Sequence, residues 1–173
     1  MYKRQTINIT GEVTNGVMTA SSTASVWIYP WTVSTTTSGI VSVTIAGEDL
    51  AGNDYVAGTQ SITFTIDNTV PTVTLTDTDS DNLVSGSNVV TIAATFSESM
   101  EASPTISISG SVTNVTMTAS STANTWFYRW LVEESFNGVG YATVSGTDNS
   151  GNIYTGTDSI TFRDLNPPKF SVT

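Results

Sequence analysis

The sequence predicts an all-β fold of antiparallel β-sandwiches in tandem, and two observations carry this prediction. β-Branched residues alternate with small polar ones along the chain, and almost no segment has helical periodicity. The chain also repeats itself, because the segments MTASSTA at residues 18–24 and SITF at residues 61–64 return at 117–123 and 159–162. The offset is 99 and later 98 residues, which is the length of a small domain rather than of a solenoid unit.

The second copy, residues 69–167, is predicted to be a complete seven-stranded sandwich. Each predicted strand has apolar side chains at alternate positions, and turn-rich segments separate the strands. The predicted strands are residues 72–76, 89–96, 105–109, 115–119, 125–132, 139–146 and 159–163. Their expected core positions begin with Val73 and Leu75, continue with Val90, Ile92, Ala94 and Phe96, then Ile106 and Ile108, and then Val115 and Met117.

The first copy, residues 6–68, is predicted to be a module truncated at its N-terminal side. Residues 6–9 align with the third strand of the complete copy, residues 105–108, and nothing upstream supplies the first two strands. We expect this copy to be less stable than residues 69–167 and to expose an apolar seam to other chains. Residues 169–173 match residues 72–76, so residues 168–173 are expected to begin a further repeat.

Composition excludes several classes of function. The net charge of −10 repels nucleic acid and anionic membrane surfaces, and no stretch approaches the roughly 20 apolar residues of a membrane-spanning helix. The chain contains no cysteine and therefore no disulfide framework. It also contains no histidine, so the usual nucleophile–base pairs are absent, and we predict that the protein is not an enzyme.

Trp126, Tyr128 and Trp130 form an aromatic stripe, since alternate residues of a strand face the same way. The same stripe recurs in the first copy at residues 27, 29 and 31. Such side chains bury 150–250 Å² each and suit a sandwich core. The alternative interpretation is an exposed platform that stacks on sugar rings.

A loop with the pattern G-x-D-x-[AS]-G-N occurs at residues 47–53 and again at 146–152. Gly-Asn suits a tight turn, and the aspartate can accept hydrogen bonds from its own loop amides. Alternatively, Asp148 offers its oxygens to calcium. In an up-and-down sandwich, Glu98, Glu101 and Asp148 would share the pole near Asp67, which gives carboxylates of the kind that calcium prefers.

A second acidic motif, Asp77, Asp79 and Asp81, has the D-x-D-x-D spacing that opens an EF-hand loop. The motif departs from that pattern at Asn82, where glycine is required, and at Asn88, where a bidentate glutamate is required. An acidic turn and a weaker calcium site are both open interpretations of this segment.

Three segments together resemble the bacterial immunoglobulin-like domains: the G-x-D-x-[AS]-G-N loop, IDNTVP at residues 66–71 and FSESM at residues 96–100. The resemblance covers residues 6–173. It implies immunoglobulin-like sandwiches strung in tandem through a large secreted or cell-surface adhesin, with calcium at the junctions between modules. The implied function is that of a structural spacer.

The implied partners are neighbouring repeats and, through other domains, a cell-surface glycan or protein. The alternative function is a carbohydrate-binding accessory module of a secreted enzyme. No other cofactor is expected.

Overall fold

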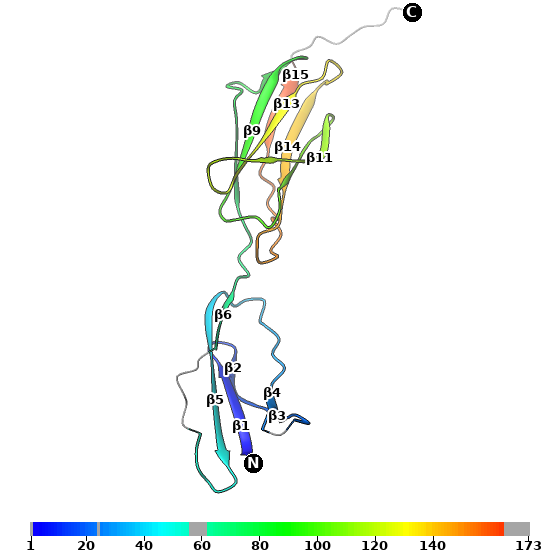
Figure 1. The fold of residues 1–173 in the computed structure, drawn as a ribbon. Coiled ribbons are helices and arrows are strands. Elements are labelled where there is room, and N and C mark those ends of the chain that lie inside the picture. Colours follow the sequence, from blue (N-terminus) through cyan, green and yellow to red (C-terminus); the bar gives the residue numbers. More distant parts are fainter. Residues whose placement is uncertain (1, 24, 56–61, 165–173) are drawn as a thin grey trace, which may run out of the picture. The chain divides into compact units, whose positions relative to one another are not determined.

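The structure is a computed structural model that describes residues 2–23, 25–55 and 62–164. The chain is all-β, with 53% strand and no helix among the described residues, so the predicted fold class is confirmed at this level. The chain divides into two compact units, Met1–Thr69 and Val70–Thr173 (Figure 1). Residues 168–173, the expected start of a further repeat, lie outside the described residues. Nowhere in the described ranges does a helix have the length and apolar character needed to cross a membrane.

The second unit contains two sheets whose strands alternate in burial. One sheet has the strand order β12 (Thr118–Ala119), β13 (Thr125–Leu131), β9 (Val89–Phe96) and β7 (Val73–Asp77). The other has the order β11 (Val112–Thr116), β10 (Thr105–Ile108), β14 (Val139–Ser145), β15 (Ile160–Asp164) and β8 (Leu83–Val84). All pairings are antiparallel except that of β15 with β8.

Both sheets contribute to a single core. Ile92 of β9, Ile106 of β10 and Ala142 of β14 are all fully buried members of one apolar cluster. Trp130 and Phe162 meet inside it with ring centroids 5.2 Å apart. Burial of each large apolar side chain contributes about 1.5–3 kcal/mol, so this cluster provides the main favourable term for folding the second unit.

The structure differs from the predicted strand at residues 115–119. It forms two strands instead, and buried Met117 lies between them. β11 pairs with β10 in one sheet, and β12 pairs with β13 in the other. The chain therefore changes sheets at Met117, and the alternating pattern did not reveal this because the pattern specifies a face and not a pairing partner. The predicted turn at residues 77–88 likewise contains the short strand β8.

The first unit contains a four-stranded sheet and a short ribbon. The sheet has the order β2 (Val13–Val17), β1 (Tyr2–Ile9), β5 (Gly39–Asp49) and β6 (Ile62–Ile66), and the ribbon pairs β3 (Thr19–Ala20) with β4 (Trp27–Ile28). β1 begins at Tyr2, ahead of the expected start at Thr6. The core of the first unit is a cluster of six buried residues: Ile7, Ile9, Met18, Val41, Val43 and Ile66.

The two units use the same turn chemistry at counterpart positions, meaning positions separated by the sequence offset. Asn15 and Asn114 both have positive φ, 51° and 48°, and the amide of each donates to the side chain seven residues earlier. Trp31 Nε1 donates to Glu12 Oε2 at 3.3 Å, and Trp130 Nε1 donates to the counterpart Ser111 Oγ at 3.0 Å. Similar local sequences therefore give similar local geometry in both units.

The units differ in what pairs with the strand that carries the aromatic stripe. In the second unit, β13 is seven residues long and pairs with β9 from Thr125 to Leu131. In the first unit, β4 is two residues long, and the only strand that pairs with it among the described residues is β3. Consequently, Phe64 of β6 is 45% exposed, whereas its counterpart Phe162 is fully buried.

Candidate carboxylate site

Asp148 organises the loop at residues 146–152 of the second unit. Its side chain is fully buried. Oδ1 accepts hydrogen bonds from the amides of Ser150 and Asn152, both at 2.8 Å, and Oδ2 accepts one from Asn152 Nδ2 at 2.8 Å. The sequence GTDNSGN folds this way because Gly151 adopts a φ of 92°, which returns the chain toward the aspartate. Asp49 makes the corresponding bonds to Ala51 and Asn53 in an exposed loop of the first unit.

The hydrogen bonds decide the ionisation of Asp148. Burial alone raises the pKa of this carboxyl, because it penalises the charged form. The side-chain and main-chain donors of Asn152, together with the Ser150 amide and Glu98, outweigh burial, so the pKa of Asp148 lies below its usual value. Asp148 is therefore a buried carboxylate that stays ionised at neutral pH.

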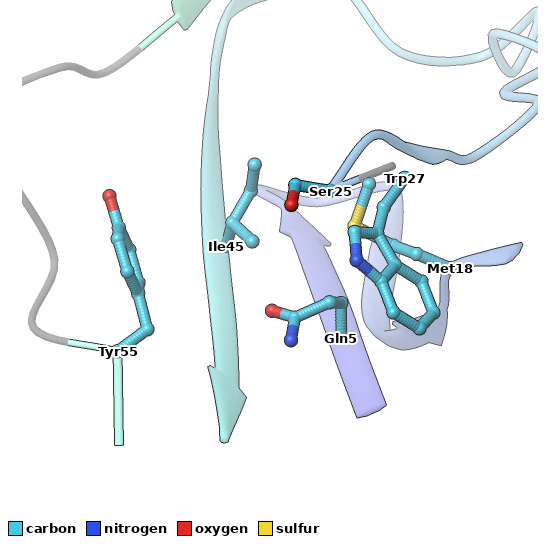
Figure 2. A pocket seen from close by; sticks show the side chains of 6 residues that line it. All are labelled: Gln5, Met18, Ser25, Trp27, Ile45 and Tyr55. Carbon is cyan, nitrogen blue, oxygen red and sulfur yellow. The ribbon is translucent and has the colours of Figure 1, made fainter. Parts of the chain in front are cut away.

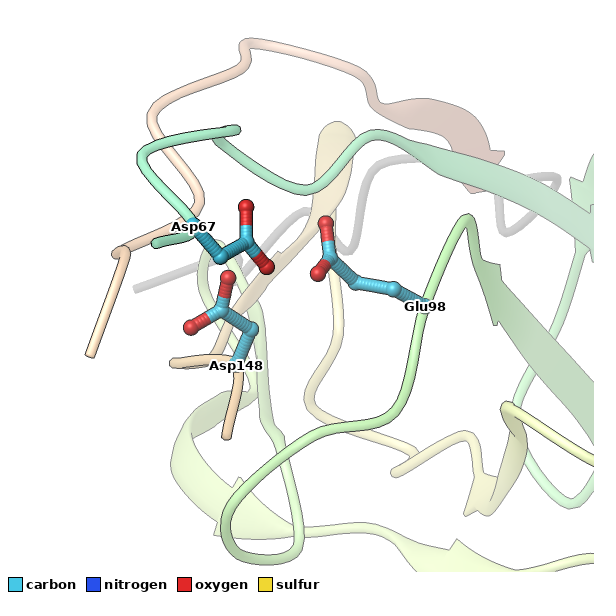
Figure 3. A group of neighbouring side chains, drawn as sticks. All are labelled: Asp67, Glu98 and Asp148. Atoms are coloured by element: carbon cyan, nitrogen blue, oxygen red, sulfur yellow. The ribbon is translucent and has the colours of Figure 1, made fainter. Parts of the chain in front are cut away.

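Glu98 is the predicted site residue that the structure brings beside Asp148. A carboxylate oxygen of Glu98 lies within 4.8 Å of one of Asp148, and Figure 3 draws the two side chains. The segment that carries Glu98 is held by main-chain bonds, since the amide of Asn149 donates to Ser99 O at 3.3 Å and Met100 forms a bridge with Asp148. Two acidic groups this close favour a cation or a proton between them.

Asp67 and Glu101 are the other two residues of the predicted calcium site. Asp67, also drawn in Figure 3, directly follows β6 in the first unit, and its Oδ1 accepts a hydrogen bond from the Thr69 amide at 2.9 Å. Glu101 is exposed and is not among the described carboxylates that lie close to Glu98 and Asp148. It lines a pocket of about 240 Å³ with Ser103 and Thr147, and its amide donates to Thr147 O at 2.9 Å.

The weaker candidate, Asp77, Asp79 and Asp81, forms a series of turns. Each carboxylate accepts the amide two residues later: Asp79 N donates to Asp77 at 2.7 Å, Asp81 N to Asp79 at 3.3 Å and Leu83 N to Asp81 at 3.1 Å. Burial raises the pKa of Asp77. Within the described ranges these residues form no group of three close carboxylates. The observed bonds are those of an acidic turn.

The aromatic stripe lies on the core side of β13. Trp130 is 1% exposed, and Trp126 and Tyr128 are half-buried and pack against the core. Leu131, on the opposite face, is 61% exposed. In the second unit the stripe is therefore a packing element.

A pocket in the first unit was not predicted from the sequence. It has a volume of about 250 Å³ and is shown in Figure 2; its lining residues are Gln5, Met18, Ser25, Trp27, Ile45 and Tyr55. Gln5 is 6% exposed, and its Nε2 has no hydrogen-bond partner in the described structure. A usable signal was present, because Tyr55 aligns with the buried Tyr154 although the strands that cover Tyr154 have no match in residues 1–69.

Comparison of the chain with models of known protein families and with curated proteins finds no match in either set.

Proposed function

We propose that this chain consists of tandem immunoglobulin-like β-sandwich modules, the first N-terminally truncated, from a bacterial adhesin-like protein. The modules act as spacers outside the cell or on its surface, with neighbouring repeats as their immediate partners. The observation that carries this proposal is the recurrence of one packing arrangement in both units. Trp31 packs on Phe64 and Trp130 on Phe162, each pair with ring planes inclined at 56°.

The composition supports the same proposal. A spacer must stay folded in a proteolytic environment, and this chain has only five basic residues at which trypsin-like proteases could cut. The chain is rich in hydroxyl groups, with 32 threonines and 23 serines, which suit a β-structure without adding positive charge. With neither histidine nor cysteine in the sequence, the proposal assigns no catalytic role.

Single-molecule stretching of the full chain between two handles tests the spacer function. The second unit is expected to unfold in one cooperative step, because its core joins both sheets. Gradual extension of the second unit without a force peak would contradict a load-bearing role.

Tryptophan fluorescence distinguishes the spacer function from the alternative function, a carbohydrate-binding module. Soluble glycans should leave the fluorescence of the full chain unchanged if the tryptophans serve packing. Saturable quenching by a sugar that is lost in a Trp126→Ala variant would favour the carbohydrate-binding function instead.

Calcium binding is a second candidate activity, favoured by the contact between Glu98 and Asp148. The proposed ligands are these two carboxylates together with Asp67 and Glu101, as expected from the sequence. Asp77, Asp79 and Asp81 form the weaker alternative site. Calcium requires six to eight oxygens, so loop carbonyls and water would complete the shell. Binding confined to the native state raises the unfolding midpoint by mass action.

Thermal unfolding in EDTA and in millimolar calcium tests this candidate. We expect calcium to raise the midpoint of the second unit, Glu98→Gln to reduce that shift, and the matched variant Glu133→Gln to leave it intact. An identical midpoint in EDTA and calcium would remove the calcium proposal while leaving the spacer function standing.

A further inference from the structure

The first unit exposes apolar side chains whose counterparts form the core of the second unit. Ile45 is 43% exposed and Tyr55 47%, whereas their counterparts Val144 and Tyr154 are 9% and 7% exposed. Phe64 shows the same difference from Phe162. Ile45 shares a face of β5 with the buried Val41 and Val43, which precede it at alternate positions. Phe64 pairs with Val41 across β5 and β6, and Tyr55 lines the same pocket as Ile45. We name this surface, made of Trp27, Ile45, Tyr55 and Phe64, the open face.

The second unit shows which element covers the counterpart of the open face. Residues of β9 lie there, and Phe96 at its end packs on Tyr154 with ring centroids 6.1 Å apart and planes at 86°. The amide of Phe96 donates to Asn124 O at 2.9 Å. Met100 follows, and its Cε lies close to Gly146: a Cβ atom at residue 146 would be only 2.7 Å from this Cε.

The pocket in Figure 2 lies at these same positions of the first unit. Ser25 is the counterpart of Asn124, and Tyr55 is the counterpart of Tyr154. The side chain of Gln5 lies against Gly47, the counterpart of Gly146, so a polar group occupies the place that Met100 takes in the second unit. Its buried Nε2 has no partner there. The pocket thus combines an aromatic wall with an unsatisfied side-chain donor, that of Gln5.

We propose that the open face binds an extended peptide segment of the β9 type. Such a segment has uncharged apolar side chains at every second position and ends in an aromatic residue. The strand pairs with the main chain of residues 26–32, as β9 pairs with β13, and the aromatic ring enters the pocket beside Tyr55. The Gln5 amide faces the same pocket and supplies a donor for a carbonyl of the segment.

Two features favour a peptide strand over other occupants. The counterpart surface is covered by a strand of this same chain, VVTIAATF at residues 89–96, which carries no charged residue and so matches an apolar face. In addition, residues 29–33 follow β4 without forming a strand, and a strand at this position can be extended by pairing with another. The proposal is independent of the spacer function and of calcium.

The test uses the full chain and a labelled synthetic peptide of residues 88–99, NVVTIAATFSES. We expect saturable binding by fluorescence anisotropy and shifts of the Trp27 and Trp31 indole resonances. A Phe96→Ala peptide should bind at least about tenfold more weakly, because it lacks the ring that fills the pocket. A Tyr55→Ser chain should weaken binding by a similar factor, and it should remain folded because Tyr55 is half-exposed.

The matched control is Tyr141→Ser, which removes an equally exposed tyrosine, 50%, from the second unit. It should leave peptide affinity unchanged. Equal binding of the Phe96→Ala peptide, or equal weakening by Tyr141→Ser, would overturn the proposal. So would a chain that binds no peptide but forms a dimer that Tyr55→Ser dissociates, because a second copy would then be the occupant.

Discussion

Asn152 donates two hydrogen bonds to Asp148, one from its main-chain nitrogen to Oδ1 and one from its side chain to Oδ2, both at 2.8 Å. These two hydrogen bonds hold the loop at residues 146–152, which follows β14, and they keep the buried carboxylate of Asp148 ionised. Any ligand of Asp148 must therefore share oxygens that already accept loop donors.

Asp148→Asn should destabilise the second unit by about 1–3 kcal/mol, because the new amide nitrogen would face the Asn152 donor and leave buried groups unpaired. The measurement is the urea midpoint of the second unit, followed by an indole resonance of Trp130. Asp49→Asn is the matched control in the exposed loop of the first unit and should have the smaller effect. Equal effects of the two variants would show that burial does not set the cost.

Acid should destabilise the second unit through Asp148. Its native pKa lies below the ordinary value of about 3.9, so the unfolded state binds more protons between the two values, and stability falls as the pH falls through that window. Burial raises the pKa of Asp77, so Asp77 acts with the opposite sign. Its contribution to the stability of the second unit is lost as the pH rises above the ordinary pKa of an aspartate. Unfolding midpoints between pH 2 and pH 7 should show a flatter slope in Asp148→Asn and a steeper one in Asp77→Asn. A slope unchanged by both variants would exclude these groups as the source.

Phe162→Ala should cost about 3–5 kcal/mol, because it opens a cavity against Trp130 in a closed core. Phe64→Ala should cost about 1 kcal/mol, since its side chain remains nearly half in water beside Trp31. Chemical denaturation followed separately through the two indoles measures both costs. A Phe64 variant as damaging as the Phe162 variant would mean that the open face is covered in solution.

Hydrogen exchange should be faster in β5 than in β14. The amides of β14 belong to a sheet packed on a second sheet, whereas β5 packs on the smaller core of the first unit. Exchange followed by mass spectrometry on the monomeric chain resolves the two strands. Comparable protection in both would contradict the expected lower stability of residues 6–68.

Asn114→Ala should destabilise the second unit by about 1 kcal/mol, because alanine disfavours a φ of 48°. Asn114→Gly should retain stability within a few tenths of a kcal/mol, since glycine adopts this conformation freely. Thermal unfolding of both variants gives the comparison. If glycine and alanine behave alike, the asparagine side chain rather than its backbone carries the effect.

The sequence determined the elements that depend on local pattern. Alternation placed Val90, Ile92, Ala94 and Phe96 on the inner side of a strand. The motif GTDNSGN specified a turn closed by its own aspartate. Both depend on residues within a few positions of each other. The turn at Asp148 was therefore predictable from local sequence, whereas Glu98 beside it was expected only from the assumed up-and-down order of the strands.

Tertiary structure decided what covers each face. Sequence pattern could not show that the chain changes sheets at Met117, since alternation is the same in either sheet. Nor could it show that Gln5 would lie where Met100 lies in the second unit, with Tyr55 half in water while Tyr154 is buried. Burial depends on partners far away along the chain, so counterpart strands end in a closed core in one unit and on an open face in the other.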